Sequence, residues 1–519
     1  MISIFLVALL LVSVIGCGAN PGPNESTAPS DISNGESVVN SETGTTTTQG
    51  GTTSSTGGQS NMGSTTTSAS SGTSVSKTSK TTASTTTTTK ITFDTSNAIE
   101  VKVNANKKLF TSHMKLGTTQ THYRWESGNA VAAMSAAQLI KDTSSINNQH
   151  IVAFGASYLQ EKQGAPLNFT SLDNLINNRL KMLGGDYMLT LCSAPGWMLK
   201  SNPSSKYDAE SRPKKEYFDE YAEICAQVAA RYPQVKQFQI WNEMKGFWDQ
   251  SRKWFDYQLY TEMYNKIYDA VKKVRPDAKV GGFYMSIRGD NSAELLGLSG
   301  LDSFDPAGDS DPLSGTGETC WKSLRYWLNN KHGADFVCID KGIQGVRTDA
   351  ELTDKQALIL CQSYESVLSR LCRETNLPIV MSEYYGLREN RALRNLTPEF
   401  QGAQFAVIYR YMLSGVKDRD YTALMWMENN DDEVCIFTDT AKANGGKATP
   451  WYYTARGFKQ YFCEGNVIVE SSSPSDKIQI MASQKKVMLI NCTTDVQVVK
   501  YANNYYQLKG YEVLFVDTV

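Results

Sequence analysis

The 519-residue sequence has no excess of charge of either sign: 51 Lys and Arg stand against 53 Asp and Glu, and the formal net charge is −2. Such a balance gives no electrostatic footprint for nucleic acid or for an anionic membrane surface. The ten cysteines include no CxxC pair and no Cys/His cluster with zinc spacing. We therefore expect no nucleic-acid partner, no metal centre and no cofactor.

Long hydrophobic runs are also lacking, apart from one at the start of the chain. Residues 2–15 are almost all apolar and small residues follow, which is typical of a signal peptide, here residues 1–19, and too short for a membrane span. The segment 14–17 (VIGC) resembles a bacterial lipobox, which would place a lipid anchor on Cys17, but no Lys or Arg precedes the apolar run. Cleavage beyond Cys17 is the other ending, and either one predicts an extracellular or surface-anchored protein.

Nine cysteines lie beyond the signal peptide. An extracellular location would permit disulfides, but the odd number leaves at least one thiol free, and the pairing cannot be read from the spacing. We expect most of these cysteines to be small buried hydrophobic residues.

Residues 20–90 consist mainly of Ser, Thr and Gly and contain almost no large apolar side chains. Such a segment cannot bury enough surface to offset the entropy of ordering, so we predict a disordered linker, either an O-glycosylated stalk or an unmodified tether. Asn-x-Ser/Thr sequons, which accept N-glycans in a eukaryotic host, occur at Asn24, Asn168, Asn395 and Asn491.

From residue 113 the sequence alternates short apolar runs with segments of helical periodicity. Eight strands separated by helices predict an α/β fold, namely a (β/α)8 TIM barrel over 113–450. A doubly wound open sheet is the alternative, but the Gly-rich phosphate turn common in such folds is absent after the first strand. The predicted strands are 114–122, 150–159, 187–195, 237–243, 279–285, 335–341, 378–385 and 422–427.

The last part of the chain has a different pattern. Residues 451–519 contain five short β-rich segments separated by turns, and the stretch 91–112 before the barrel is similar. We predict that the two stretches together form an accessory β-sandwich.

Two predicted strands carry a glutamate at or near their carboxyl ends. The fourth strand ends at Glu243, and the seventh contains Glu383 two residues before its end. The carboxyl ends of barrel strands meet at one face of the fold, where active sites lie. Glycoside hydrolysis needs such a pair, because one carboxyl protonates the leaving oxygen while the other attacks the anomeric carbon. Glutamates also cap helices, but a Trp-Asn-Glu sequence matched by a second Glu three β/α units later favours catalysis.

The segment 238–248 (FQIWNEMKGFW), with Asn-Glu on strand four and Glu on strand seven, resembles clan A glycoside hydrolases. The best fit is glycoside hydrolase family 39, the family of β-xylosidases and α-L-iduronidases. Similarity extends through 191–198 (LCSAPGWM), the segment 264–284 and the β-rich tail, and it covers most of residues 110–519.

The resemblance implies that Glu243 is the acid/base, Glu383 the nucleophile, Asn242 a ligand of the sugar 2-hydroxyl and Trp426 the aromatic floor of the subsite. One position departs from the family, which often has His-x-Tyr at the end of strand six, where this chain reads Ile-Asp-Lys-Gly at 339–342. Tyr384 or Tyr385 is a candidate replacement for the missing tyrosine. The departure makes the substrate harder to predict than the reaction class.

Other residues near the predicted mouth have two interpretations. His122 and Trp197 could contact sugar or serve only in packing. The acidic run 428–433 is a solvated loop, a calcium site or an additional carboxylate of the site. The long loop 286–319 would shape substrate access.

These observations predict a secreted retaining glycosidase acting on polysaccharide-derived oligosaccharides, β-xylosidase-like, with a carbohydrate as its partner. An endo-acting clan A glucanase or mannanase is the alternative within enzymes. An inactive surface carbohydrate-binding protein is the alternative outside them, although it would not need two such carboxylates.

Overall fold

The computed structural model describes residues 93–120, 125–153, 156–200, 211–249, 251–252, 254–287, 318–343, 353–386, 397–427, 435–442 and 444–519. Within these ranges no helix is long and apolar enough to cross a bilayer. Several predictions fall outside them, namely those for the signal peptide, Cys17, the linker 20–90, Asn24, His122, Asn395, the acidic run 428–433 and most of the loop 286–319.

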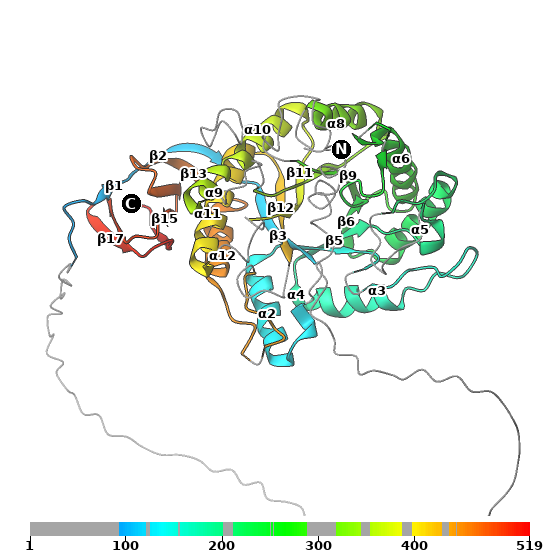
Figure 1. Ribbon diagram of the computed structural model, residues 1–519, viewed down its shortest axis with the longest axis horizontal. Helices are drawn as coiled ribbons and strands as arrows, with labels where there is room; N and C mark the ends of the chain where they lie inside the picture. Colours follow the sequence, from blue (N-terminus) through cyan, green and yellow to red (C-terminus); the bar gives the residue numbers. More distant parts are fainter. Residues whose placement is uncertain are drawn as a thin grey trace, which may run out of the picture. The chain divides into compact units, whose positions relative to one another are not determined.

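Eight strands close into a barrel in the order β10-β11-β12-β3-β4-β5-β6-β9 (Figure 1). Every neighbouring pair is parallel, so all eight carboxyl ends lie at one face. The predicted (β/α)8 barrel is confirmed. The strands are β3 Met114–Gln120, β4 Ile146–His150, β5 Asp186–Leu191, β6 Val235–Ile240, β9 Lys279–Ser286, β10 Phe336–Lys341, β11 Ile379–Tyr384 and β12 Tyr421–Met427.

Helices follow each strand and surround the barrel (Figure 1). Their apolar faces pack on the strands in one continuous core, as expected for amphipathic helices. They are α2 Ala130–Thr143, α3 Thr170–Asn174 continuing through a π-turn into α4 Lys181–Leu183, α5 Phe218–Arg231, α6 Tyr257–Val274, α8 Glu318–Asn330, α9 Asp354–Leu360, α10 Ser363–Glu374, α11 Pro398–Val416 and α12 Pro450–Phe462.

Three buried helix tyrosines hold the ends of barrel strands. Tyr221 of α5 donates a hydrogen bond to the carbonyl of Leu191 at 2.9 Å, at the end of β5. Tyr260 of α6 does the same for the last residue of β6, at 3.1 Å, and Tyr364 of α10 for the last residue of β10, at 2.7 Å. These bonds fix the backbone at the face where parallel barrels hold their active sites.

Two antiparallel arrays form the accessory sandwich, one ordered β18-β15-β14-β13-β2 and the other β1-β16-β17. Val101, Ile480 and Val499 belong to the apolar cluster shared by the two sheets, as in other sandwiches. The segment before the barrel thus joins the tail, as predicted. The strands are β1 Ile99–Glu100, β2 Lys102–Thr111, β13 Val467–Ser472, β14 Ile478–Ser483, β15 Lys486–Asn491, β16 Gln497–Tyr501, β17 Asn504–Leu508 and β18 Val513–Asp517.

The structure corrects three details of the prediction. The second barrel strand is Ile146–His150 rather than 150–159; its centre, Asn147 to Gln149, is polar, yet these side chains are almost completely buried. Residues 451–462, predicted to begin the sandwich, instead belong to α12, the helix that follows the last barrel strand. The hairpin strand Asn504–Leu508 was not predicted.

Most of the described cysteines and one of the two described sequon asparagines are buried. Seven of the nine described cysteines are buried, which agrees with the expected hydrophobic role. Asn491 is completely buried and donates hydrogen bonds to the carbonyls of Asp495 and Lys509, so this sequon does not present an accessible amide. Asn168 is exposed.

Candidate active site

Glu243 and Glu383 meet at the carboxyl face of the barrel. Glu243 follows β6 and Glu383 lies in β11, with β9 and β10 between the two strands. Their exposed fractions are 8% and 4%. They are close enough that the charge of Glu243 raises the pKa of Glu383. The structure therefore brings together the two carboxyl groups that the strand ends predict.

The backbone around Glu243 is strained. Trp241, Glu243 and Met244 have φ angles of 68°, 46° and 51°, in the left-handed region that costs roughly 1–3 kcal/mol for such residues. The buried indole of Trp241 donates a hydrogen bond to the carbonyl of Lys245 at 2.8 Å and so closes the turn. Strain of this kind concentrates at functional sites, because the surrounding structure must hold a side chain in a defined direction.

A lysine two residues further on contacts the first glutamate. Lys245 Nζ lies 2.7 Å from Glu243 Oε2, and both side chains are largely buried. In a site of low polarity a cation at this distance favours the ionised form of the carboxyl group. Lys245 was not predicted from the sequence, because none of the motifs described above assigns it a role.

Glu383 has a different environment. Burial raises the pKa of Glu383 to about 7, and the charge of Glu243 adds to the effect, whereas hydrogen bonds from Tyr385 and Tyr284 and the charge of Lys245 oppose it. The hydroxyl group of Tyr385 donates a hydrogen bond to Glu383 Oε2. Of the two tyrosines considered in the sequence analysis, Tyr385 contacts Glu383, whereas Tyr384 bonds to Tyr409.

A third carboxyl group, Asp340 of β10, belongs to the same site. It is completely buried, and its backbone pairs with Glu383 just beyond a register shift in the ladder of β10 and β11. Such bulges re-aim side chains next to active sites. Tyr385 Oη lies 3.5 Å from Asp340 Oδ2. The sequence prediction treated this position only as a departure from the family pattern.

A ring of hydrogen bonds crosses the barrel interior beneath Glu383. Thr119 donates to the carbonyl of Ser382 at 2.5 Å, Asn148 to Thr119 at 3.2 Å, and Thr190 to Asn148 at 3.0 Å. Gln239 donates to Thr190 at 3.3 Å, and Ser382 donates to Gln239. All five side chains are completely buried, and each donor finds an acceptor, so the layer is fully satisfied. It explains why the second strand is polar.

Two further aromatic residues contact Tyr385, the tyrosine next to Glu383. The ring of Tyr385 packs edge-on against Trp426, with centroids 5.6 Å apart, and Trp426 is 7% exposed. The Tyr364 hydroxyl lies 2.8 Å from the carbonyl of Tyr385. Trp426 therefore lies beside the tyrosine that contacts Glu383.

The other predicted residues have different outcomes. Asn242 is 5% exposed, and its Oδ1 is buried without a hydrogen-bond partner among the described residues, which suits a group that awaits a ligand hydroxyl. Trp197 is half-buried and packs edge-on against Tyr217, with ring centroids 5.1 Å apart, and its indole nitrogen has no hydrogen-bond partner among the described residues. His122 lies outside the described residues.

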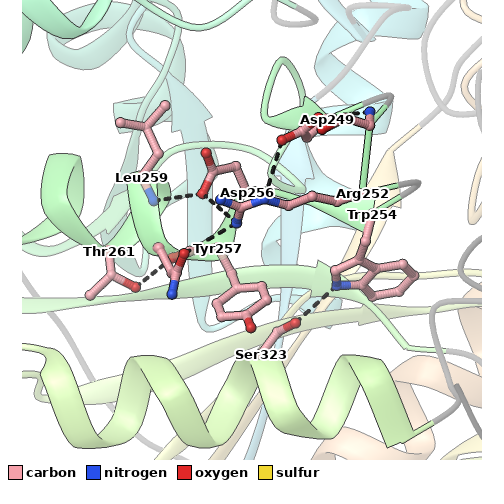
Figure 2. Close-up of polar contacts among 10 residues, drawn as sticks. Asp249, Arg252, Trp254, Asp256, Tyr257, Leu259, Thr261 and Ser323 are labelled. Carbon is pink, nitrogen blue, oxygen red and sulfur yellow. Dashed lines mark hydrogen bonds and ion pairs between the residues drawn. The ribbon is translucent and has the colours of Figure 1, made fainter.

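The chain after Glu243 forms a short hairpin of β7 Trp248–Asp249 and β8 Trp254–Phe255 before α6 begins. Figure 2 shows Arg252 between Asp249, at 3.2 Å, and Asp256, at 3.4 Å. Asp256 also caps α6 by accepting from the amide of Leu259, and Trp254 donates to Ser323 of α8 at 2.9 Å. These contacts anchor the hairpin to two helices and support the turn that carries the glutamate.

The raised pKa of Glu383 predicts a stability effect. Glu383 binds its proton more tightly in the folded than in the unfolded chain, so the stability that it contributes at low pH is lost as the pH rises through about 7. Glu383→Gln is therefore expected to increase the free energy of unfolding by roughly 1–3 kcal/mol at pH 8 and to change it little at pH 4. Denaturant unfolding at both pH values measures this.

The exposed Glu223 of α5 supplies the control, since Glu223→Gln should have the same small effect at both pH values. An equal effect of Glu383→Gln at pH 4 and pH 8 would contradict the raised pKa.

No protein-family model and no curated protein matches the sequence. Solved structures match with low identity. A conserved exported protein from Bacteroides fragilis is 12% identical at a TM-score of 0.54, covering 80% of this chain and 98% of that one. SrfJ from Salmonella typhimurium is 12% identical at 0.52, covering 82% and 94%. A monomeric beta-xylosidase from Caulobacter crescentus CB15 is 14% identical at 0.50, covering 76% and 77%. At 12–14% identity these matches show a shared fold, and one of the matched proteins is a beta-xylosidase, the kind of enzyme that the sequence resembles.

Proposed function

We propose that the chain is a retaining glycosidase that hydrolyses O-glycosidic bonds of polysaccharide-derived oligosaccharides and is exported by the signal peptide 1–19. The observation that carries the proposal is the pair Glu243 and Glu383, two buried carboxyl groups that influence each other's ionisation at the carboxyl face of a (β/α)8 barrel. Hydrolysis with retention uses two such groups, one as acid/base and one as nucleophile.

In this proposal Glu383 attacks the anomeric carbon while Glu243 protonates the leaving oxygen. The covalent intermediate is then hydrolysed by water, whose proton returns to Glu243. Tyr385 orients the nucleophile through its hydrogen bond. The free Oδ1 of Asn242 accepts a hydrogen bond from a sugar hydroxyl, and Trp426 offers the sugar an aromatic face beside Tyr385.

As the acid/base, Glu243 must hold a proton when substrate arrives, and the nucleophile Glu383 must be ionised. In the protein alone, Lys245 favours the ionised form of Glu243, and burial favours the protonated form of Glu383. Because the two groups interact, their protons belong to the pair. A sugar that covers Glu383 and brings a partial positive charge to its anomeric carbon favours the ionised nucleophile and moves the proton to Glu243.

Two measurements test the proposal. The first is proton NMR of the product formed from a panel of aryl β-glycosides, β-xylosides first, in which we expect the β-anomer to appear before mutarotation. The second is labelling by a 2-deoxy-2-fluoro glycoside, which should attach to Glu383 and be found by peptide mass spectrometry.

A product of inverted configuration would remove the nucleophile from the mechanism. Binding of oligosaccharides without any hydrolysis would favour the carbohydrate-binding protein, and cleavage only within long chains would favour the endo-acting glycanase.

A further inference from the structure

The regular pairing of the barrel strands is interrupted next to Glu383. In β11, Met381 and Glu383 have partners in β10, but Ser382 between them has none. On the other side of the strand, neither Ser382 nor Glu383 has a partner in β12. The pairing of β11 with its two neighbours therefore does not by itself hold the backbone at the point from which Glu383 extends.

Side chains in the barrel interior bond to Ser382 at this point. The hydroxyl group of Thr119 donates to the carbonyl of Ser382 at 2.5 Å, although β12 lies between β3, which carries Thr119, and β11. The hydroxyl group of Ser382 donates to the amide oxygen of Gln239 in β6. All three side chains are completely buried, so a partner whose donor is removed stays unsatisfied.

The direction of the Thr119 hydrogen bond follows from its second partner. The amide nitrogen of Asn148 donates to the Thr119 hydroxyl oxygen at 3.2 Å. A threonine hydroxyl group has a single proton, and the carbonyl of Ser382 can only accept. Thr119 therefore accepts from Asn148 and gives its own proton to the bond with Ser382.

This bond acts on the peptide group from which Glu383 extends. The carbonyl of Ser382 and the amide nitrogen of Glu383 belong to one planar group, so the bond from Thr119 fixes that plane and the position of the Glu383 Cα atom. The bond to Gln239 fixes only the Ser382 side chain, which can rotate about its Cα–Cβ bond. Tyr385 contacts the carboxyl end of Glu383. The nucleophile is thus held at its base by Thr119 and at its tip by Tyr385.

We propose that Thr119 is a positioning residue of this site, whose hydroxyl group holds the peptide plane before Glu383 and so keeps the carboxyl group where it can attack the anomeric carbon. The inference rests on the proposed glycosidase function, in which Glu383 is the nucleophile. Thr119 acts through Ser382 and touches no reacting atom. Its effect can still be large, because a misplacement of about 1 Å can lower the rate by roughly 100-fold.

Three substitutions at Thr119 separate the hydroxyl group from the packing of the side chain. Thr119→Val keeps nearly the same shape without the hydroxyl group, so kcat should fall by roughly 100-fold. KM should change by less than about threefold, since no contact with substrate is removed. Thr119→Ser keeps the hydroxyl group and should stay within about threefold of wild-type kcat. Thr119→Cys, with a weaker donor of similar size, should lie between the two and gives the same comparison if the valine variant does not fold.

The opposite order would overturn the proposal. If the valine variant is active and the serine variant is not, the methyl group of Thr119 matters through packing, and the hydrogen bond does not position Glu383.

Thr190 of β5 supplies the matched control. It is an equally buried threonine of the same layer, and its hydroxyl group contacts Asn148 and Gln239 rather than the segment that carries Glu383. Thr190→Val should lower the denaturant midpoint about as much as Thr119→Val, but kcat should stay within about threefold of wild type. An equal loss of kcat in the two valine variants would reflect general disruption of the layer and would overturn the proposal.

Crystal structures of the two valine variants test the inference without substrate. In Thr119→Val the carboxyl group of Glu383 should move by about 1 Å or more and lose its contact with Tyr385, whereas in Thr190→Val it should stay in place. An unmoved Glu383 in Thr119→Val would overturn the proposal even if the protein is a glycosidase. A displaced Glu383 in a protein that hydrolyses no glycoside would support the positioning role and remove only the proposed function.

Discussion

Glu383→Ala is expected to lower kcat/KM for an aryl β-glycoside by roughly 10⁴-fold or more, in the range found when an enzyme loses its nucleophile. Glu383 is held by Tyr385 and faces Glu243 across the mouth of the barrel, and no other carboxyl group of the described residues occupies the same strand end. Removal of the side chain leaves the anomeric carbon without an attacking group, although binding and protonation of the leaving oxygen remain.

Sodium azide should restore part of this activity. The anion is small enough to enter the space left by the Glu383 side chain and attacks the anomeric carbon from the face that Glu383 occupied. The product is then a glycosyl azide of inverted configuration, because a single displacement replaces two. NMR of the azide product and initial rates with and without azide measure both effects.

Glu399 provides the control, since it is an exposed glutamate in the first turn of the helix that follows the same strand. Glu399→Ala should retain wild-type rates and show no response to azide. If Glu383→Ala hydrolyses the substrate as fast as Glu399→Ala, Glu383 is not the nucleophile.

The fold was largely predictable because apolar periodicity is a local property of the sequence. Seven of the eight strands lie where alternating apolar runs place them. The exception, Ile146–His150, owes its position to Asn148, whose partners Thr119 and Thr190 are 29 and 42 residues away. A polar strand that is satisfied only across the barrel looks like a loop when its own residues are considered alone.

The site was predictable as far as the strand-end rule extends. The rule identifies Glu243 and Glu383, but it does not identify Lys245, which acts through a turn with strained backbone, or Tyr284, which reaches Glu383 from β9. Asp340 did leave a signal, because an aspartate that follows the apolar run 336–339 in a barrel strand is costly to bury unless a partner faces it. The family pattern draws attention to the missing His-x-Tyr at the end of this strand rather than to the aspartate that is present.

Glu243→Ala should have an effect that depends on the leaving group. For a substrate with a sugar or alkyl leaving group, which needs protonation, kcat/KM is expected to fall by roughly 10²–10⁴-fold. The leaving group of a dinitrophenyl glycoside departs without protonation, so kcat/KM for this substrate should stay within about tenfold of wild type. Its kcat should nevertheless fall, because no general base activates water in the second step. Rates with a series of substituted phenyl glycosides measure this dependence.

Azide again supplies the decisive control, because it needs no general base. In Glu243→Ala it should attack the covalent intermediate on Glu383, restore kcat for the dinitrophenyl substrate and give a glycosyl azide of retained configuration, opposite to the product of Glu383→Ala. This contrast matters because Lys245 contacts Glu243 and favours its ionised form, while burial raises the pKa of Glu383, the group assigned as nucleophile, to about 7. If the two azide products were exchanged between the variants, Glu243 would be the nucleophile and Glu383 the acid. The contact of Glu243 with Lys245 and the raised pKa of Glu383 would then match these roles as they stand.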